Sequence, residues 1–356
     1  MIDKIAHIAT FHCVPNYGAV LQTYGLQQYL KTVFKEVRVL DYRPDALLKE
    51  YKNINCYSIG SIAFSLWSLF PFIAKKRSFA KFEKRFNLSD VVGKTAEDFQ
   101  GLISDYLFCG SDQIWNPSVT HGFDPVFFGA LKTNSSPKII SYAASLGKSV
   151  FSKQELFQMK TLLEHVNVIS VRETDAQDLL SKVLNIEATV VADPTILAGS
   201  EVFKPLVKDV RYKKYLFVYT LTNNPKTLQV AKEVAKKKGL QIIQVNGNRK
   251  PFHKPNHIII NDAGPEEFLS LLFHSDFVVT DSFHGTVFSN LFHVPYITIP
   301  HKTRGGRMVT LLTELGMLDR LIDKADVSEM SIDWTVVDNN LKRMQNKSIE
   351  FINRSI

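Results

Sequence analysis

Cysteine is scarce in this chain of 356 residues, which contains Cys13, Cys56 and Cys109 and no other thiol. The number is odd, and no pair has the C-x-x-C spacing of a zinc or redox motif. Isolated thiols fit a reducing compartment and argue against a disulfide framework or a zinc site. The cysteines therefore predict a cytoplasmic protein without structural cross-links.

Long apolar runs and export signals are also missing. The stretch richest in apolar residues, 61–74 (SIAFSLWSLFPFIA), contains serines and a proline, and it is shorter than the roughly 20 residues that a membrane-spanning helix needs. The first residues, MIDKIAHIATFH, show no basic start followed by an apolar core and a cleavage site. We expect neither a membrane span nor export.

Recognisable nucleic-acid-binding motifs are absent as well. The net charge of +8 and the isoelectric point near 9.1 suit nucleic acid, anionic lipid headgroups or phosphorylated small molecules alike. Neither a zinc finger nor a ribonucleoprotein motif accompanies this charge. We therefore expect no nucleic-acid partner.

The chain does show a regular alternation of short β-branched runs and helical segments, which is typical of parallel α/β sheets. Periodicity weakens near Gly199 and resumes at the strand KYLFVYT, so a domain boundary is expected there. The pattern predicts a GT-B-like α/β fold: Rossmann-like domains at 1–199 and 200–330, with parallel sheets facing an interdomain cleft, and a C-terminal helix at 331–356. In the first domain we expect strands near 5–11, 37–41, 106–110, 139–143, 168–171 and 189–192, and helices near 19–32, 75–86, 153–165 and 175–183.

Ligands of such sheets bind outside the carboxyl ends of the strands, so we looked for chemistry at the strand-to-helix junctions. The first junction, FHCVPNYGAV, has a tight loop with Gly18 ahead of an amphipathic helix. A glycine there lets a ligand approach the backbone, and the free amides of the helix favour an anion. A plain β-to-α turn explains the same glycine equally well.

The junction FCGSDQIWNP places polar side chains and Trp115 directly after a predicted buried strand. Such a mixture suits a sugar, whose hydroxyls form hydrogen bonds and whose C–H face stacks on a ring. Helix N-capping by Ser111 or Asp112 is the competing explanation, but it does not account for Gln113 and Trp115. We therefore favour sugar binding.

Arg172 in SVRETDAQDLL ends a predicted strand, and its guanidinium can hold a phosphate or carboxylate through two parallel hydrogen bonds. A surface pair with Glu173 or Asp175 is the alternative and would stabilise little. In VADPTIL, Asp193 and Pro194 are expected to form a turn and part of a wall between the domains.

The second half contains two polar junctions. TDSFHG brings Asp281, Ser282 and His284 to a strand end, ahead of a helix expected after Gly285. An imidazole there can act as a general acid or base, and a neighbouring acid can orient it. The next junction, PHKTRGGR, suits an anion because it concentrates cations among glycines, although a solvated basic loop is the alternative. Its cationic candidates are His301, Lys302, Arg304 and Arg307.

The segment AKKRSFAKFEKRF repeats basic residues and phenylalanines at helical spacing. We expect Phe79, Phe82 and Phe86 to pack on the first domain while the charges face water. The alternative joins this segment to the preceding apolar stretch, so that residues 61–86 make peripheral contact with an anionic membrane surface.

In this order, the motifs NYGAVLQTYGLQQYL, CGSDQIWNP, SYAASLG, SVRE, VADPTIL, TDSFHGTVFSNLF and RGGRMVTLLTELGMLDRLI resemble the polysaccharide pyruvyl transferase family over most of residues 1–322. The resemblance implies an enzyme that moves the enolpyruvyl carbons of phosphoenolpyruvate onto two hydroxyls of a sugar, forming a cyclic ketal and releasing phosphate. It implies no metal or other cofactor. The expected acceptor is a glycan or lipid-linked oligosaccharide of exopolysaccharide or capsule synthesis, at the inner face of the cell membrane.

The resemblance also implies residue roles. His284 matches the family's motif histidine and is the expected general acid/base, and Arg172 matches the arginine of SVRE and is expected to bind the donor. Many members carry an arginine where this chain has Ser282, so we expect cations of the HKTRGGR loop to supply that charge. The assigned donor residues are Arg172, Ser282, Gly285, Lys302, Arg304 and Arg307, and the assigned acceptor residues are Asn16, Tyr17, Gly18, Asp112, Gln113 and Trp115.

Two other functions remain open at this stage. One is a nucleotide-sugar glycosyltransferase of the same architecture, and the other is a catalytically silent relative that binds a glycan or an anion. Ser282 is the best support for the silent relative. His284, Arg172 and the HKTRGGR loop favour an enzyme, because folding alone does not require them at separate junctions.

Overall fold

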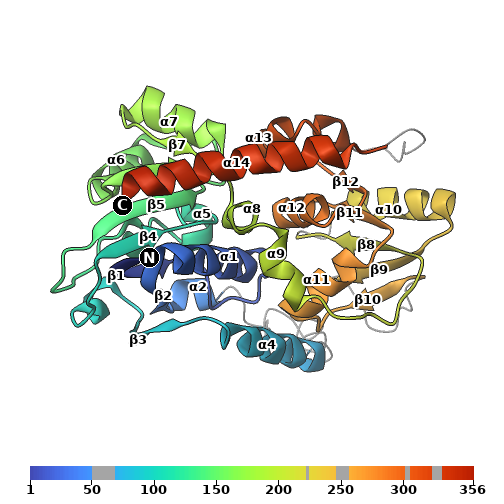
Figure 1. Cartoon of the computed structure of the whole chain (residues 1–356), viewed down its shortest axis with the longest axis horizontal. Helices are drawn as coiled ribbons and strands as arrows, with labels where there is room; N and C mark the ends of the chain where they lie inside the picture. The colour runs from blue at the N-terminus through green and yellow to red at the C-terminus, as the bar shows by residue number, and fades with distance from the viewer. Residues whose placement is uncertain (50–68, 222–223, 246–255, 301–304, 323–330) are drawn as a thin grey trace.

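The structure is a computed structural model that describes residues 1–49, 69–221, 224–245, 256–300, 305–322 and 331–356. Its first half builds a sheet of seven parallel strands in the order β3-β2-β1-β4-β5-β6-β7 (Figure 1). The strands are β1 (Ile2–Ala9), β2 (Phe34–Tyr42), β3 (Leu88–Gly93), β4 (Tyr106–Cys109), β5 (Lys138–Ala144), β6 (Val168–Val171) and β7 (Thr189–Val190). The α-helices are α1 (Tyr17–Val33), α2 (Asp45–Lys49), α4 (Leu69–Glu83), α5 (Pro117–Thr120), α6 (Lys153–Leu163) and α7 (Thr174–Leu184), with 3-10 turns η1 (Ala96–Phe99) and η2 (Pro125–Phe128).

The second half builds a parallel sheet of five strands in the order β10-β9-β8-β11-β12. These strands are β8 (Tyr215–Tyr219), β9 (Gln241–Val245), β10 (Ile258–Ile260), β11 (Phe277–Thr280) and β12 (Tyr296–Thr298). The helices are α8 (Pro194–Ala198), α9 (Ser200–Phe203), α10 (Pro225–Lys238), α11 (Pro265–Phe273), α12 (Phe283–Leu291), α13 (Gly306–Leu315) and α14 (Trp334–Ser355), with 3-10 turns η3 (Lys204–Leu206) and η4 (Leu318–Arg320).

Central strands are buried along their whole length, as β8 (YLFVY) and β11 (FVVT) show. Continuous apolar runs of this kind are expected where helices cover both faces of a parallel sheet. The predicted fold class is confirmed, because two parallel, doubly wound sheets follow one another in a GT-B-like arrangement. Among the described helices, none is long and apolar enough to cross a membrane.

Two strands and one helix start differ from the sequence-based expectation. The strands β3 and β10, each at an edge of its sheet, were not predicted, because both are only partly buried and lack a continuous buried apolar run. The helix expected after Gly285 begins at Phe283 instead, since the side chain of Ser282 caps its first turn. His284 therefore lies inside the helix.

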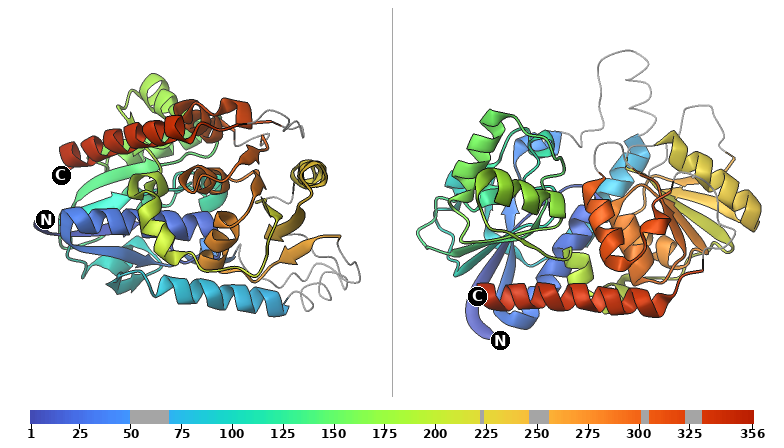
Figure 2. Two further views of the ribbon diagram at one scale, coloured as in Figure 1. Left: turned by 45° about the vertical axis from the view of Figure 1, so that its right-hand side comes forward. Right: turned by 90° about the horizontal axis from the view of Figure 1, so that it is seen from above.

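Two helices tie the sheets together. In α1, the ring of Tyr17 stacks on Phe268 of the second half at 4.5 Å, and its hydroxyl donates to the carbonyl of Ala263 at 2.8 Å. The C-terminal helix α14 starts beside the second sheet and ends over the first (Figure 2), and the hydroxyl of Ser348 accepts a hydrogen bond from the amide of Ala192 at 2.9 Å. Both contacts fix the strand ends of one sheet against the other.

Candidate functional site

The site forms where the carboxyl ends of β4, β6 and β7 meet the start of α12. Arg172 directly follows β6, Asp193 begins α8 after β7, and His284 lies in the first turn of α12. All three side chains are buried. The sheets thus bring together a cation, a carboxylate and an imidazole that lie far apart in the sequence.

Asp193 is the centre of this cluster. Its Oδ2 accepts a hydrogen bond from Nη1 of Arg172 at 2.9 Å and lies 3.6 Å from Nε2 of His284. Its Oδ1 accepts from the amide and the hydroxyl of Thr195 at 3.0 and 2.6 Å. The carboxylate therefore orients the arginine of one domain and the histidine of the other.

The charges of Asp193 and Arg172 stabilise each other. Burial disfavours ionisation of Asp193, but His284 and Arg172 outweigh it and hold the pKa of this carboxyl well below its usual range. Burial likewise opposes the charge of Arg172, yet Asp193, Asp112 and Glu173 raise its pKa. Both groups are ionised at neutral pH, which gives His284 a fixed negative neighbour.

Several buried polar atoms of this cluster have no hydrogen-bond partner within the described residues. They are Nε and Nη2 of Arg172, Nε2 of His284 and Oε2 of Glu173. A buried donor without a partner costs about 1–3 kcal/mol, and such groups in a folded protein commonly mark a ligand or water position. Of these atoms, Nε and Nη2 of Arg172 are charged donors of the kind that bind an anion, whereas the carboxylate oxygen of Glu173 is an acceptor.

His284 is positioned by close packing as well as by Asp193. Its ring lies against Gly18 of α1, where an added Cβ would collide with the imidazole. Gly18 was predicted to let a ligand approach the backbone, and the structure shows that the group approaching it is His284 itself. Only glycine leaves room for the imidazole at this position.

Phe283 lies between two guanidinium groups. The ring centroid is 4.5 Å from Cζ of Arg172 and 5.9 Å from Cζ of Arg307, which are distances of cation–π contacts. Arg307 is buried in α13 and lines a small cavity of about 30 Å³ between the domains, together with Lys148, Glu173 and Asp175. Of the predicted donor cations, Arg172 and Arg307 are thus brought to the same place.

The other predicted donor residues have different positions. Lys302 and Arg304 lie outside the described residues. The hydroxyl of Ser282 accepts a hydrogen bond from the amide of Gly285 at 3.4 Å and caps α12, while Gly285 packs closely on Thr280. In the described structure, Ser282 and Gly285 shape the turn that presents His284.

The predicted acceptor residues include two aromatic side chains, Trp115 and Tyr17, and several polar ones. Trp115 is fully buried, donates to the carbonyl of Phe127 at 3.0 Å and stacks on Phe128, so this placement contradicts its predicted role as a stacking surface for a sugar. Tyr17 is likewise buried in the domain contact described above. An aromatic ring that fills a core has the same sequence signature as one that binds a sugar.

The polar members of the predicted acceptor set stay near the strand ends. Asp112 has a left-handed backbone with φ of 70°, and its Oδ1 lies 3.5 Å from Nη2 of Arg172. Oε1 of Gln113 accepts a hydrogen bond from Nδ2 of Asn116 at 3.0 Å, and Asn16 caps α1 by accepting from the amide of Ala19 at 3.3 Å. Asp112 alone of these contacts the Arg172 cluster.

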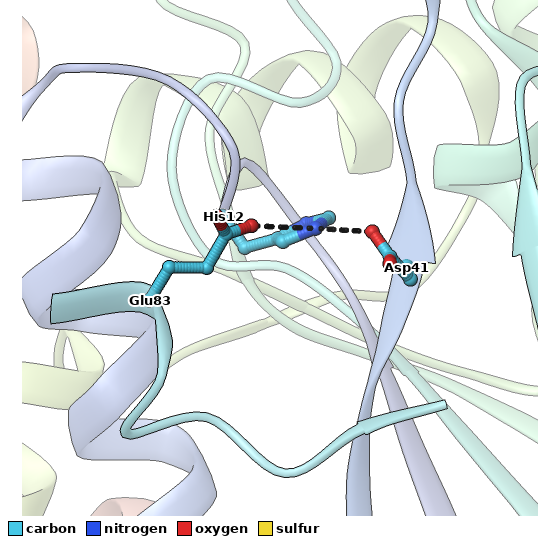
Figure 3. Close-up of side chains that lie close together, drawn as sticks. All are labelled: His12, Asp41 and Glu83. Carbon is cyan, nitrogen blue, oxygen red and sulfur yellow. Dashed lines mark hydrogen bonds and ion pairs between the residues drawn. The ribbon is translucent and has the colours of Figure 1, made fainter. Parts of the chain in front are cut away.

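A second buried cluster, at the ends of β1 and β2, was not predicted. Nε2 of His12 lies 3.2 Å from Asp41 and 3.9 Å from Glu83 (Figure 3). This set could ligate a metal ion, but Arg43 donates to both carboxylates at 2.5 and 2.6 Å. A divalent cation would have to displace the guanidinium, so the cluster fits an ion network that joins α4 to the sheet.

A larger cavity of about 840 Å³ lies in the first domain, and Tyr42 at the end of β2 forms part of its wall. Its lining combines aromatic and polar side chains, among them His121, Phe123 and Lys94. The hydroxyl of Tyr42 donates to Asp124 at 2.8 Å. A cavity of this size and lining is typical of a site for an organic ligand.

Comparison with known proteins finds one matching family. The family model described as polysaccharide pyruvyl transferase matches residues 16–303. No curated protein matches the chain in sequence.

Solved structures with similar folds include UDP-GlcNAc 2-epimerase from Neisseria meningitidis, with 12% identity, TM-score 0.48 and coverage of 99% of both chains. UDP-N-acetylglucosamine 2-epimerase from Rickettsia bellii has 10% identity and TM-score 0.45, covering 100% of this chain and 99% of the other. An α-glucosyltransferase in complex with UDP and DNA has 11% identity and TM-score 0.49, covering 99% and 93%.

Proposed function

The chain belongs to the polysaccharide pyruvyl transferase family, and we propose that it transfers the enolpyruvyl group of phosphoenolpyruvate to two hydroxyls of a glycan sugar, forming a cyclic ketal. We place this reaction in exopolysaccharide or capsule synthesis in the cytoplasm. The observation that carries the proposal is the buried cluster in which Asp193 accepts a hydrogen bond from Arg172 and lies beside His284. In this cluster, Nε and Nη2 of Arg172 and Nε2 of His284 have no hydrogen-bond partner among the described residues.

The donor requires a binding site for two anionic groups, because phosphoenolpyruvate carries a carboxylate and a phosphate. Arg172 presents Nε and Nη2, a planar pair suited to two parallel hydrogen bonds with one such group. Arg307 approaches the same phenylalanine ring from α13 and is proposed to hold the other. This arrangement supports Arg307 as the source of the positive charge that an arginine supplies in many family members where this chain has Ser282. Lys302 and Arg304 are further proposed contacts of the donor.

Proton transfer to carbon is the step that needs an acid. We assign it to Nε2 of His284, since this buried atom lies 3.6 Å from Asp193 and has no hydrogen-bond partner among the described residues. The proton adds to the methylene carbon of phosphoenolpyruvate while an acceptor hydroxyl bonds to the neighbouring carbon. The bond from that carbon to the phosphate oxygen then breaks, phosphate leaves with the oxygen, and the second hydroxyl closes the ketal. Of the two hydroxyl protons of the acceptor, one accounts for the new methyl hydrogen and the other goes to the released phosphate.

The acceptor is proposed to meet this centre on the side of the first domain. Asp112 is the predicted acceptor residue that contacts Arg172, with Gln113 and Asn16 at neighbouring strand ends. We propose that further sugars of the glycan occupy the cavity beside Tyr42, whose aromatic and polar lining suits them. Trp115 and Tyr17 are not part of this proposal.

The test is an assay with the purified chain, phosphoenolpyruvate and a panel of candidate glycosides. The proposal predicts release of phosphate together with a gain of a pyruvate ketal in the mass of one glycoside, and loss of both in His284→Ala. Near-normal turnover by His284→Ala would show that His284 is not the general acid. Protection from thermal unfolding by nucleoside diphosphates but not by phosphoenolpyruvate would favour a glycosyltransferase, and sugar binding without turnover across the panel would favour a silent relative.

A further inference from the structure

The helix α4 has one face packed against both halves of the molecule. Phe79 and Phe82 are buried, with ring centroids 5.1 Å from Tyr17 and 5.7 Å from Tyr24, both in α1. The helix also contacts α11 of the second half. This confirms that the phenylalanines of the segment pack inward and shows that α4 is packed on both halves of the protein.

The opposite face of α4 is exposed and has two parts. At its start, Phe70 has 84% of its surface exposed and Ile73 has 36%. Basic residues follow along the same side, where spacings of three and four bring side chains of a helix into line. We call this the outer face of α4. All of its residues are exposed, and the last one lies just beyond the helix end: Phe70, Ile73, Lys76, Arg77, Lys81 and Lys84.

The cations of the outer face are not neutralised by the described part of the protein. The four basic residues of this face make no ion pair with any described residue, whereas neighbouring Arg85 pairs with Glu266. The one acid of α4, Glu83, is held by Arg43 at 2.6 Å. The face therefore presents positive charge beside an exposed phenylalanine, without an acid of its own to balance it.

The helix α4 lies at the edge of the described part of the molecule. The helix runs along the lower rim of the molecule, below α1 and α11, on the outside of both sheets (Figure 1). A helix with an apolar end and a cationic face is suited to lie in the plane of a membrane interface, where the rings enter the headgroup boundary and the cations meet phosphates. A protein partner would instead require acidic side chains placed to match three lysines and one arginine.

We propose that the outer face of α4 binds the surface of an anionic lipid bilayer. Phe70 and Ile73 enter the boundary between headgroups and acyl chains, and the four cations contact lipid phosphates. The choice of a bilayer rests in part on the proposed function, since an acceptor attached to a lipid carrier would bring the enzyme to a membrane. The charge and exposure of the face are independent of that function.

Sedimentation with vesicles tests the proposal on the full-length chain. The parent is expected to sediment with vesicles of phosphatidylcholine and phosphatidylglycerol, to remain in solution with phosphatidylcholine alone, and to dissociate as salt is raised. Replacing Phe70 and Ile73 with serine, or Lys76 and Arg77 with glutamine, should each weaken binding by about tenfold or more.

Matched controls come from other helices. Phe157→Ser removes another exposed phenylalanine, 73% exposed, from α6. A double change of Lys232 and Lys236 to glutamine removes two exposed lysines from α10. Both controls should bind vesicles like the parent, and circular dichroism should show that every variant is folded.

Each outcome decides the inference. Failure of the parent to sediment, or equal binding by the α4 variants and the parent, contradicts it. The parent could fail to bind vesicles and instead form a dimer that is lost when Phe70 and Ile73 are replaced with serine. That result would show that a second copy of the chain covers the face. Phosphate release with a soluble acceptor, measured on the same samples, separates the two proposals: vesicle binding without turnover contradicts only the function, and turnover without vesicle binding contradicts only the membrane contact.

Discussion

Asp193 shows how one carboxylate can organise a site at the scale of single residues. It follows β7, caps α8 and still reaches both Arg172 and His284. An ionised buried carboxylate is stable only with such partners, because burial alone would neutralise it. We infer that Asp193 positions the two residues that are proposed to contact the donor.

The variant Asp193→Asn should lower kcat by at least tenfold and destabilise the fold by about 3 kcal/mol, since breaking a buried ion pair leaves the other charge uncompensated. The pKa of Asp193 is lowered in the folded state, so its stabilisation is present above the ordinary carboxyl pKa of about 4 and is lost as pH falls further. The difference from the parent should therefore shrink below about pH 4. Urea unfolding across pH measures this.

Asp178→Asn is the control, because Asp178 makes only an exposed pair with Lys182, and such a pair contributes little. Equal stability of Asp193→Asn and the parent at neutral pH would contradict the account. A KM that rises while the pH dependence of kcat stays unchanged would limit Asp193 to donor binding through Arg172.

Some site residues could be predicted from sequence and others could not. Arg172 directly follows β6 and His284 lies in the helix turn after β11, and side chains at the carboxyl ends of parallel strands face the ligand side. The role of Asp193 was missed because its main partner His284 lies in the other domain. Trp115 was misassigned because the burial of an indole depends on the residues that pack on it. Those residues cannot be identified from the local sequence pattern.

At the scale of elements, the packing of α1 against α12 sets the position of the imidazole. Gly18→Ala should reduce turnover strongly while changing stability little, because the added Cβ collides with His284 but alanine favours a helix by about 1 kcal/mol over glycine. Assays of kcat together with thermal unfolding test this. Gly101→Ala, which meets no atom within 4 Å, should behave like the parent, and full activity of Gly18→Ala would place the imidazole elsewhere.

Long helices and central strands were predictable elements, since their apolar periodicity is strong. The strand β6 was predicted with its observed ends, Val168–Val171, because a buried β-branched run stands between clear helices. The start of α12 was misplaced by a few residues, since the cap depends on which hydroxyl meets the free amides. That error matters here because it hid the placement of His284 inside the first turn.

At the scale of the whole molecule, the two sheets share one apolar cluster. It includes Tyr17 and Phe79 from the first half and Phe268 and Tyr219 from the second. The alternation of elements predicted both sheets, but the shared cluster could not be predicted, because the partners of Tyr17 come from segments more than 200 residues away.

This shared core predicts a single cooperative unfolding transition for the described domains. Tryptophan fluorescence and far-ultraviolet circular dichroism should give the same urea midpoint, because neither sheet can lose the contacts of α1 and α14 alone. Trp115 reports on the first domain and Trp334 on the start of α14. Two separate midpoints would show that the domains unfold independently, contrary to this account.

The central claim is that the Asp193 cluster protonates phosphoenolpyruvate on carbon and releases phosphate by breaking the bond between carbon and oxygen. The most direct test uses phosphoenolpyruvate carrying an isotopic label in its bridging oxygen, an acceptor found in the glycoside panel, and deuterium oxide as solvent. Mass spectrometry should find the labelled oxygen in the released phosphate and one deuterium in the methyl group of the ketal. Labelled oxygen in free pyruvate, with unmodified acceptor, would contradict the account.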